Sequence, residues 1–217
     1  MDKANILAHR GYWKDAVDKN TFSAIKMALK KGYGIETDVR DLDGQLVISH
    51  DPPTHINKLL FSDFTNYILE TKTKSRIALN IKSDGLQEKI NHDLNTKFNS
   101  SGQFYSFDMS VPDTLSYRKI SFPFYFRVSE YENEYSLING ADGAWVDSFT
   151  DRFDQIKHAR KILEMGKRAA VVSPELHGRN HWPIWEKIKN NNLHQLLGLE
   201  LCTDLPDEAY KYFCEDQ

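Results

Sequence analysis

Short runs rich in β-branched and aromatic residues recur along the chain, and longer amphipathic stretches separate them. The apolar runs are residues 5–9, 35–39, 76–82, 104–108, 124–128, 143–147, 168–172 and 198–204. Helical patterns occupy roughly residues 20–32, 86–98, 110–119, 154–165, 182–191 and 206–214. Strands that alternate with helices predict an α/β fold with a parallel sheet, and eight strands match a closed TIM barrel. An open doubly wound sheet is the alternative.

The overall composition is that of an ordinary globular chain. Its 217 residues are 40% hydrophobic and 27% charged, with a formal net charge of −3. Single barrels commonly reach this length, so we expect one domain over residues 1–217. The chain lacks the basic excess of nucleic-acid-binding domains, and we expect no nucleic-acid partner. It also lacks a run long enough to span a membrane and an apolar signal segment, which together favour a cytoplasmic protein. The oligomeric state is left open.

Charged residues gather where the predicted strands end. Catalytic residues of α/β folds lie at the carboxyl ends of their strands, so these positions are the first candidates for a site. They are His9 and Arg10, Glu36 and Asp38, Lys82, Asp108, Asp147 and Asp204. For the last three acids, capping of the next helix is the favoured interpretation and substrate contact the alternative.

Glu36 and Asp38 are two residues apart in one predicted strand, so their side chains point to the same face, with Cα atoms roughly 7 Å apart. If that face is the interior of a barrel, ionising both carboxylates is costly, and a cation between them resolves the conflict. A hard divalent ion, Mg²⁺ or Ca²⁺, suits such oxygen ligands.

The stretch DVRDLDGQLVISHD predicts a short β-hairpin after the second barrel strand, with an Asp-Gly turn. The length of the turn decides where His50 lies. A two-residue loop at Asp43 and Gly44 places His50 opposite Thr37, pointing away from the carboxylates. A three-residue loop with a bulge at Gly44 places His50 opposite Glu36. A catalytic role of His50 requires this second register.

The motifs AHRG, E-x-D, DGQLVISHD, NIK, YSFD and CTDLPDEA occur in this order over nearly the whole chain. Together they resemble the glycerophosphodiester phosphodiesterase family. The resemblance implies a TIM barrel that hydrolyses a small, soluble glycerol-type phosphodiester to an alcohol and glycerol phosphate with the help of one divalent cation. A barrel that binds phosphodiesters without cleaving them is one alternative, and a lyase-type enzyme that releases a cyclic phosphate is another.

Carried over residue by residue, the resemblance implies that Glu36 and Asp38 hold the metal ion. His9 and His50 would serve as acid and base, and Arg10 and Lys82 would bind the phosphoryl oxygens. Two positions depart from the family pattern. Asn80 stands where a third acidic ligand is usual, so we expect a metal site with an amide ligand and weaker affinity. Lys19 stands where the family usually has a glutamate.

The loops after the later strands carry further charged residues. Glu175 in VVSPELHGRNHW is a candidate contact for substrate or metal. We expect Glu175 to line the mouth of the barrel with polar groups, together with Arg127, Glu130 and Arg179. Such a wall would favour hydroxyl-rich alcohols over acyl chains.

Overall fold

The computed structural model describes residues 1–54, 59–98, 102–132 and 135–214. Eight parallel strands form a closed ring, which confirms the predicted TIM barrel over the doubly wound sheet. They are β1 (Ile6–His9), β2 (Gly34–Leu42), β5 (Ile77–Ile81), β6 (Phe104–Phe107), β7 (Tyr125–Val128), β8 (Gly143–Val146), β9 (Arg168–Val172) and β10 (Leu199–Thr203). The ring runs through neighbouring pairs in chain order and returns from β10 to β1. Between β6 and β7 it closes through a single bridge from Ser106 to Phe124.

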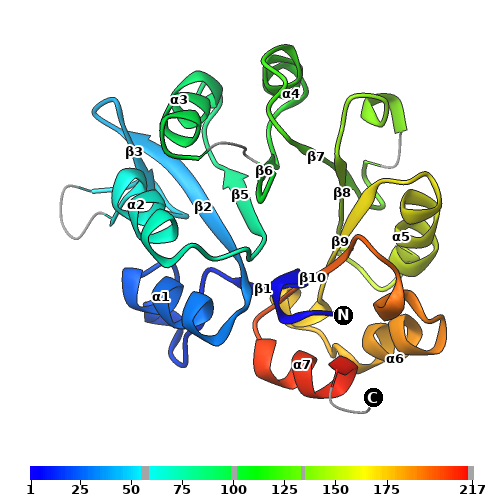
Figure 1. Ribbon diagram of the computed structural model, residues 1–217. Helices are drawn as coiled ribbons and strands as arrows, with labels where there is room; N and C mark the ends of the chain where they lie inside the picture. The colour runs from blue at the N-terminus through cyan, green and yellow to red at the C-terminus, as the bar shows by residue number, and fades with distance from the viewer. Residues whose placement is uncertain (55–58, 99–101, 133–134, 215–217) are drawn as a thin grey trace.

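The helices form an outer layer around this ring (Figure 1). They are α1 (Phe22–Lys31), α2 (Phe61–Thr71), α3 (Gln87–Lys97), α4 (Val111–Lys119), α5 (Gln155–Glu164), α6 (Trp182–Asn190) and α7 (Pro206–Cys214). Short 3-10 turns add η1 (Lys3–Asn5), η2 (Ala16–Asp18), η3 (Tyr135–Leu137), η4 (Pro174–His177) and η5 (Leu193–Gln195). None of the helices in the described part of the chain is long and apolar enough to cross a membrane.

Helix α2 was not predicted from the sequence, although its pattern is present there. Phe61, Phe64, Thr65 and Ile68 are its buried residues. Their spacing of three, four and seven is that of one helical face. The passage between the hairpin and β5 therefore contains a regular barrel helix, which packs against α3 and the hairpin.

The hairpin contains β3 (Gln45–Ile48), and β4 (Leu59–Leu60) pairs with β3 on its other side. Leu42 pairs with Gln45, so only Asp43 and Gly44 form the loop. Both have positive φ, 49° and 77°, as a type I′ turn requires. The bulged register considered for His50 is therefore wrong.

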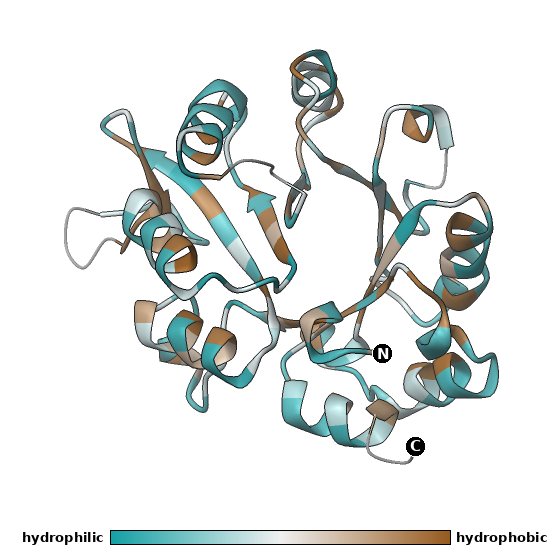
Figure 2. Ribbon diagram, in the orientation of Figure 1, coloured by the Kyte–Doolittle hydropathy of each residue, from teal (hydrophilic) through white to brown (hydrophobic). Residues whose placement is uncertain are grey.

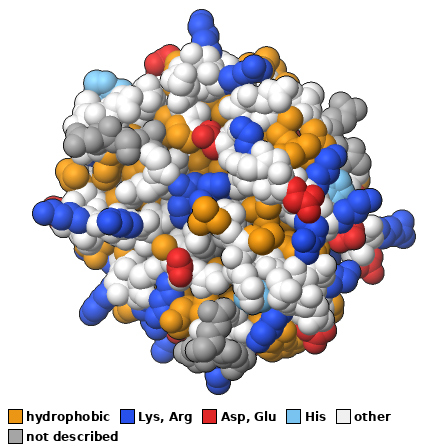
Figure 3. Space-filling model, turned by 45° about the vertical axis from the view of Figure 1, so that its right-hand side comes forward, with side chains coloured by type: hydrophobic (Ala, Val, Ile, Leu, Met, Phe, Trp, Pro, Cys, Tyr) orange, Lys and Arg blue, Asp and Glu red, His pale blue; other side chains and the backbone are white. Residues whose placement is uncertain are grey.

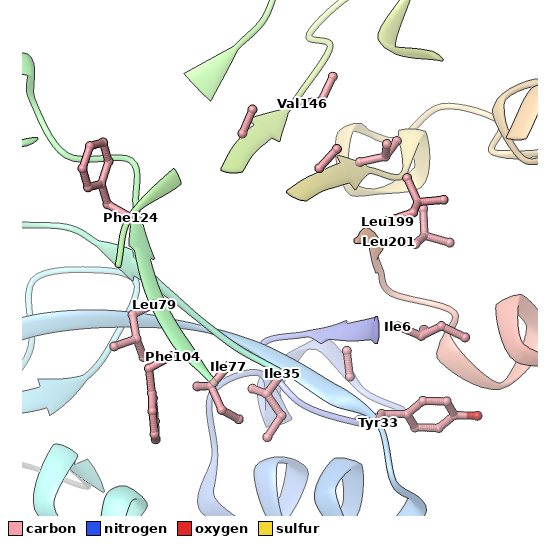
Figure 4. Packing of buried hydrophobic residues seen from close by; sticks show 14 of the residues in the cluster. Ile6, Tyr33, Ile35, Ile77, Leu79, Phe104, Phe124, Val146, Leu199 and Leu201 are labelled. Atoms are coloured by element: carbon pink, nitrogen blue, oxygen red, sulfur yellow. The ribbon is translucent and has the colours of Figure 1, made fainter. Parts of the chain in front are cut away.

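Apolar side chains of the strands serve two separate cores. One set points outward against the helices, as Ile6, Ile35, Ile77, Leu199 and Leu201 do in Figure 4. A second set fills the middle of the barrel: Leu7, Ala78, Tyr105, Phe107, Tyr125, Trp145, Ala170, Val172 and Cys202. Because successive residues of a strand face opposite sides, polar residues in phase with the inner set also point into the barrel. Figure 2 accordingly shows hydrophilic and hydrophobic residues interspersed within single strands.

A buried cluster of charges lies at the end of the barrel where the strands begin. Glu200 is fully buried, and its carboxylate accepts hydrogen bonds from Arg76 at 2.9 Å and Arg168 at 2.8 Å. The hydroxyl groups of Tyr105 and Tyr125 donate to the same carboxylate at 2.7 and 3.2 Å. This end of the barrel is thus closed by a paired network.

Replacing Glu200 by alanine tests the importance of this network. The change leaves two partly buried guanidinium groups without their carboxylate, so we expect the free energy of unfolding to fall by about 3 to 5 kcal/mol. Urea denaturation measures the loss. As a control, Glu164→Ala removes an exposed carboxylate at the end of α5 and should change it by less than about 0.5 kcal/mol. Similar small effects of both changes would contradict a structural role for Glu200.

Candidate active site

His9 ends β1 and is held by Asp204, which follows the neighbouring strand β10. The His9 Nδ1 atom lies 2.6 Å from Asp204 Oδ1, and both side chains are largely buried. Burial alone would raise the pKa of the Asp204 carboxyl, but the hydrogen bond with His9 and the charges of His9 and Lys19 together lower it. The carboxylate fixes the imidazole so that Nε2 lies 3.9 Å from Glu36 Oε2.

The glycine of the His-Arg-Gly motif lets this loop touch helix α1. Gly11 has φ of 92°, and a Cβ atom there would lie 2.8 Å from the carbonyl carbon of Ala24. Any other residue would therefore push the loop away. Arg10, with φ of 57°, is held so that its backbone N–H donates to Glu36 Oε2 at 3.2 Å and its Nε lies 3.0 Å from Asp38 Oδ2.

Two carboxylates are buried side by side at the mouth of the barrel. Glu36 is 2% exposed and Asp38 is fully buried. Arg10 and the Lys82 ammonium, 3.4 Å from Asp38 Oδ1, supply compensating positive charge. Burial and then the charge of Asp38 raise the pKa of Glu36 to about 7, although His9, Arg10 and Lys82 oppose the shift. Ionised Glu36 is therefore unfavourable near neutral pH unless a further positive charge binds beside it.

Asn20 is a site residue that could be recognised from the sequence only as a candidate cap of α1, a role that Thr21 has in the structure. Its Nδ2 donates to Asp38 Oδ2 at 2.8 Å, and its Oδ1 accepts from Thr37 at 2.8 Å. Asn20 has φ of 60°, a conformation that asparagine tolerates better than most residues. The preceding Lys19 lies 3.5 Å from Asp204 Oδ2. Lys19, which stands where the family usually has a glutamate, thus contacts Asp204, the residue that orients His9.

The residues at this point suit a hard divalent cation. Asp38 and Asn80 are paired in register on neighbouring strands β2 and β5. Asn80 Oδ1 and Asp38 Oδ1 are buried and have no hydrogen-bond partner. With Glu36 they offer two carboxylates and one amide oxygen, which are ligand types of Mg²⁺ and Ca²⁺. Within the described residues, no group of three or more His, Cys, Asp or Glu side chains forms a metal site.

A row of alternating charges crosses the mouth from the carboxylate pair. Lys82 Nζ lies 3.7 Å from Asp108 Oδ2, and Arg127 Nε donates to Asp108 at 3.0 Å. Arg127 also donates to Asp147 at 2.8 Å, and Asp147 Oδ1 lies 2.8 Å from His177 Nε2. Lys82 thus links the carboxylate pair to the far side of the mouth.

The prediction that Asp108 and Asp147 cap the next helices is wrong. Ser110 caps α4 and Asp154 caps α5, each accepting a hydrogen bond from a backbone N–H of the first turn. The two strand-end acids instead pair with Arg127, because side chains at the ends of neighbouring strands are within reach of one another. Asp108 also has a strained backbone, with φ of 73°.

His50 lies at the rim of the mouth, away from the carboxylates. Strand β3 ends at Ile48, and His50 Nδ1 lies 2.9 Å from Asp51 Oδ1. Its side chain is 44% exposed and borders a cavity of about 820 Å³ that Arg10 and Asn20 also line. The two-residue turn therefore leaves His50 on the same cavity as Arg10, although not in the position expected for a catalytic role.

The four loop residues expected to form a polar wall are bonded to the protein itself. Glu175 accepts from Ser173, from Thr203 and from the backbone N–H of Asp204. Glu130 accepts from the backbone of Thr150, and Arg179 donates to the carbonyl groups of Ser148 and Thr150. Arg127 pairs with two aspartates, as described above. These contacts engage all four side chains within the protein, and Glu175 supports the loop of Asp204.

No protein-family model and no curated protein sequence matches the chain. Solved structures match nearly all of it. A glycerophosphodiester phosphodiesterase from Parabacteroides distasonis has a TM-score of 0.71 at 16% identity, covering 99% of this chain and 98% of that chain. A phosphodiesterase from Oleispira antarctica, in complex with the product sn-glycerol-3-phosphate, has a TM-score of 0.67 at 18% identity and covers 98% and 97%.

A third match is a Ca²⁺-dependent phosphatidylinositol-specific phospholipase C from Streptomyces antibioticus. Its TM-score is 0.60 at 11% identity, with coverage of 94% of this chain and 95% of that chain. Identities this low show a shared fold. This chain therefore has the same barrel fold as these three structures.

The raised pKa of Glu36 predicts how stability changes with pH in the absence of metal ions. Protonated Glu36 favours the folded state, so its contribution is complete below pH 4.5 and is lost as the pH rises through about 7. The loss should be roughly 3 kcal/mol. Glu36→Gln cannot ionise and should lack this dependence. Urea unfolding with a chelator at pH 4, 6 and 8 compares the two proteins, and parallel curves would contradict the assignment.

Proposed function

We propose that this protein is a metal-dependent phosphodiesterase that hydrolyses a small glycerol-type phosphodiester to an alcohol and glycerol phosphate. One observation carries the proposal. The oriented His9, the buried carboxylate pair and the cations Arg10 and Lys82 meet at the mouth of a barrel whose fold is shared with glycerophosphodiester phosphodiesterases. The product complex of one such structure supports glycerol phosphate as the common part of the substrate.

Each group has a role that follows from its position. Arg10 and Lys82 bind the phosphoryl oxygens and stabilise their growing negative charge. Glu36, Asp38 and Asn80 hold a divalent cation, which when bound adds Lewis-acid stabilisation of that charge. Asp204 keeps the His9 ring oriented and stabilises its protonated form.

His9 and His50 act as acid and base on two sides of the phosphate. One histidine accepts a proton from the attacking water, and the other donates a proton to the departing alkoxide, so that no net proton is lost. Positioned imidazoles each contribute about 10² to 10⁴ in rate. His50 lies exposed at the rim, and the cavity that it borders is also lined by Arg10, which supports a role for His50 near a phosphate bound by Arg10.

Two other functions remain as alternatives. Asn80 and Lys19, which replace expected acids, motivate a barrel that binds phosphodiesters without cleaving them. The contact of Lys19 with Asp204 argues against the binding-only alternative. It helps to keep His9 oriented, and a protein that only binds phosphodiesters does not need an oriented histidine. A neighbouring hydroxyl of the substrate could attack in place of water, giving a cyclic phosphate.

A cytoplasmic location of the protein stays a prediction from its sequence.

Assays with glycerophosphodiesters test the proposal. Purified protein should release glycerol phosphate in the presence of Mg²⁺ or Ca²⁺, and exhaustive chelation should abolish this activity. Analysis of the product separates glycerol phosphate from a cyclic phosphate. Phosphodiester binding without turnover under any metal condition would favour the binding alternative. Full activity of metal-free protein would contradict a metal-dependent reaction.

Alanine at His9 or His50 should raise the barrier to turnover by roughly 3 to 5 kcal/mol, while KM changes little. His92→Ala, an exposed histidine on α3, is the control and should leave the rate unchanged. Steady-state kinetics measure all three variants. A histidine whose loss leaves more than about a tenth of the turnover is not an acid or base of this reaction.

Asn80→Asp should tighten metal binding, because it adds a negative charge to an oxygen that already faces the carboxylate pair. Isothermal titration of metal-free protein with Ca²⁺ and Mg²⁺ gives the dissociation constants. The control Asn95→Asp adds the same charge on the exposed side of α3. An affinity that changes equally in both variants would exclude Asn80 as a ligand.

A further inference from the structure

A cavity of about 340 Å³ opens beside the row of charges, on the β6–β7 side of the mouth. Asp108 and Arg127 form its boundary with the site. Asp108 is also the residue next to Lys82, which lies against the carboxylate pair. Apolar and aromatic residues form about half of the cavity lining: Met109, Val111, Tyr125, Phe126, Tyr131 and Leu137. Thr114, Glu132 and Ser136 add further polar groups. Asp108 therefore connects the cavity to Lys82, one of the residues assigned to the phosphate.

The charged groups of this cavity are already engaged. Arg127 lies between Asp108 and Asp147 and also lies 3.4 Å from Glu132 Oε2. An anionic group would meet more negative than positive charge here. Beyond the hydroxyl groups of Thr114 and Ser136, a hydroxyl-rich group would find few polar partners, and unsatisfied hydroxyls weaken binding.

Apolar side chains are exposed around the opening of the same cavity. Val111 is 60% exposed and Tyr131 74% exposed. Phe149, 43% exposed, lies with its ring 5.9 Å from that of Tyr131 and packs over the Arg127 guanidinium. Exposed apolar side chains gathered around a cavity are typical of a binding site. Figure 3 shows one face of the molecule, on which basic, acidic and apolar side chains are mixed.

On the basis of the proposed phosphodiesterase function, we propose that this cavity binds the alcohol group of the diester and prefers a compact apolar alcohol, aryl or short alkyl. Its volume lies at the lower end of the roughly 300 to 1,000 Å³ found for small-ligand pockets. The larger cavity beside Arg10, Asn20 and His50 offers polar groups for the glycerol phosphate part. The preference is the opposite of that expected from a polar wall.

Two diesters that differ only in the alcohol test this assignment: glycerophosphoglycerol and the benzyl ester of glycerol phosphate. Both alcohols are aliphatic, so the comparison avoids the better leaving group of a phenol. The wild-type protein should show a kcat/KM at least about tenfold higher for the benzyl diester. Equal values, or a preference for glycerol, would overturn the assignment while leaving the phosphodiesterase intact. If neither diester is cleaved, the proposed function fails, and the assignment fails with it.

Val111→Asp and Leu115→Asp provide a matched pair of variants on α4. Both residues are exposed, but only Val111 lines the cavity. As the first residue of a helix, position 111 accepts aspartate readily. The charge at 111 should lower the preference for the benzyl diester about tenfold. Leu115→Asp should leave the preference unchanged. A preference that survives Val111→Asp, or falls equally in both variants, would place the alcohol elsewhere.

Discussion

The two carboxylates that share one face of β2 impose a constraint that the rest of the site satisfies. Buried negative charges need partners, and Glu36 and Asp38 lie at the same end of a closed barrel. Arg10 and Lys82 supply part of the compensation, and the pKa of Glu36, raised to about 7, shows that the compensation is incomplete. A divalent cation would supply the missing positive charge. With Arg10 and Lys82 it would also provide the cationic environment that a phosphate requires.

The two ends of the barrel use buried charge differently. At one end, Glu200 has two arginines and two tyrosines around it, and the network is closed. At the other end, Asn80 Oδ1 has no hydrogen-bond partner, and Asp38 Oδ1 has none apart from the Lys82 ammonium at 3.4 Å. Arg10, Asn20 and Asp108 adopt strained backbone conformations with positive φ. Strain and unsatisfied polar groups at the same end are typical of a functional site and not of a structural one.

Much of the fold and part of the site could be predicted from local sequence. Strand composition and helix spacing identified all eight barrel strands, and the E-x-D spacing placed Glu36 and Asp38 on one face. The pairs His9–Asp204 and Lys82–Asp108 could not be predicted, because each joins residues that only the closure of the sheet brings together. The turn at Asp43 and Gly44 allowed two registers, and local sequence does not choose between them. Helix α2 was missed because its pattern follows the hairpin without a clear cap.

The central claim is that Glu36, Asp38 and Asn80 hold a divalent cation beside a phosphate bound by Arg10 and Lys82. The most direct test is a crystal structure of the protein with Mn²⁺ and glycerol phosphate, recorded at the manganese absorption edge. The account predicts one strong anomalous peak within bonding distance of the three side chains and of a phosphate oxygen. A phosphate bound without that peak, with Arg10 and Lys82 still paired to Asp38, would contradict it.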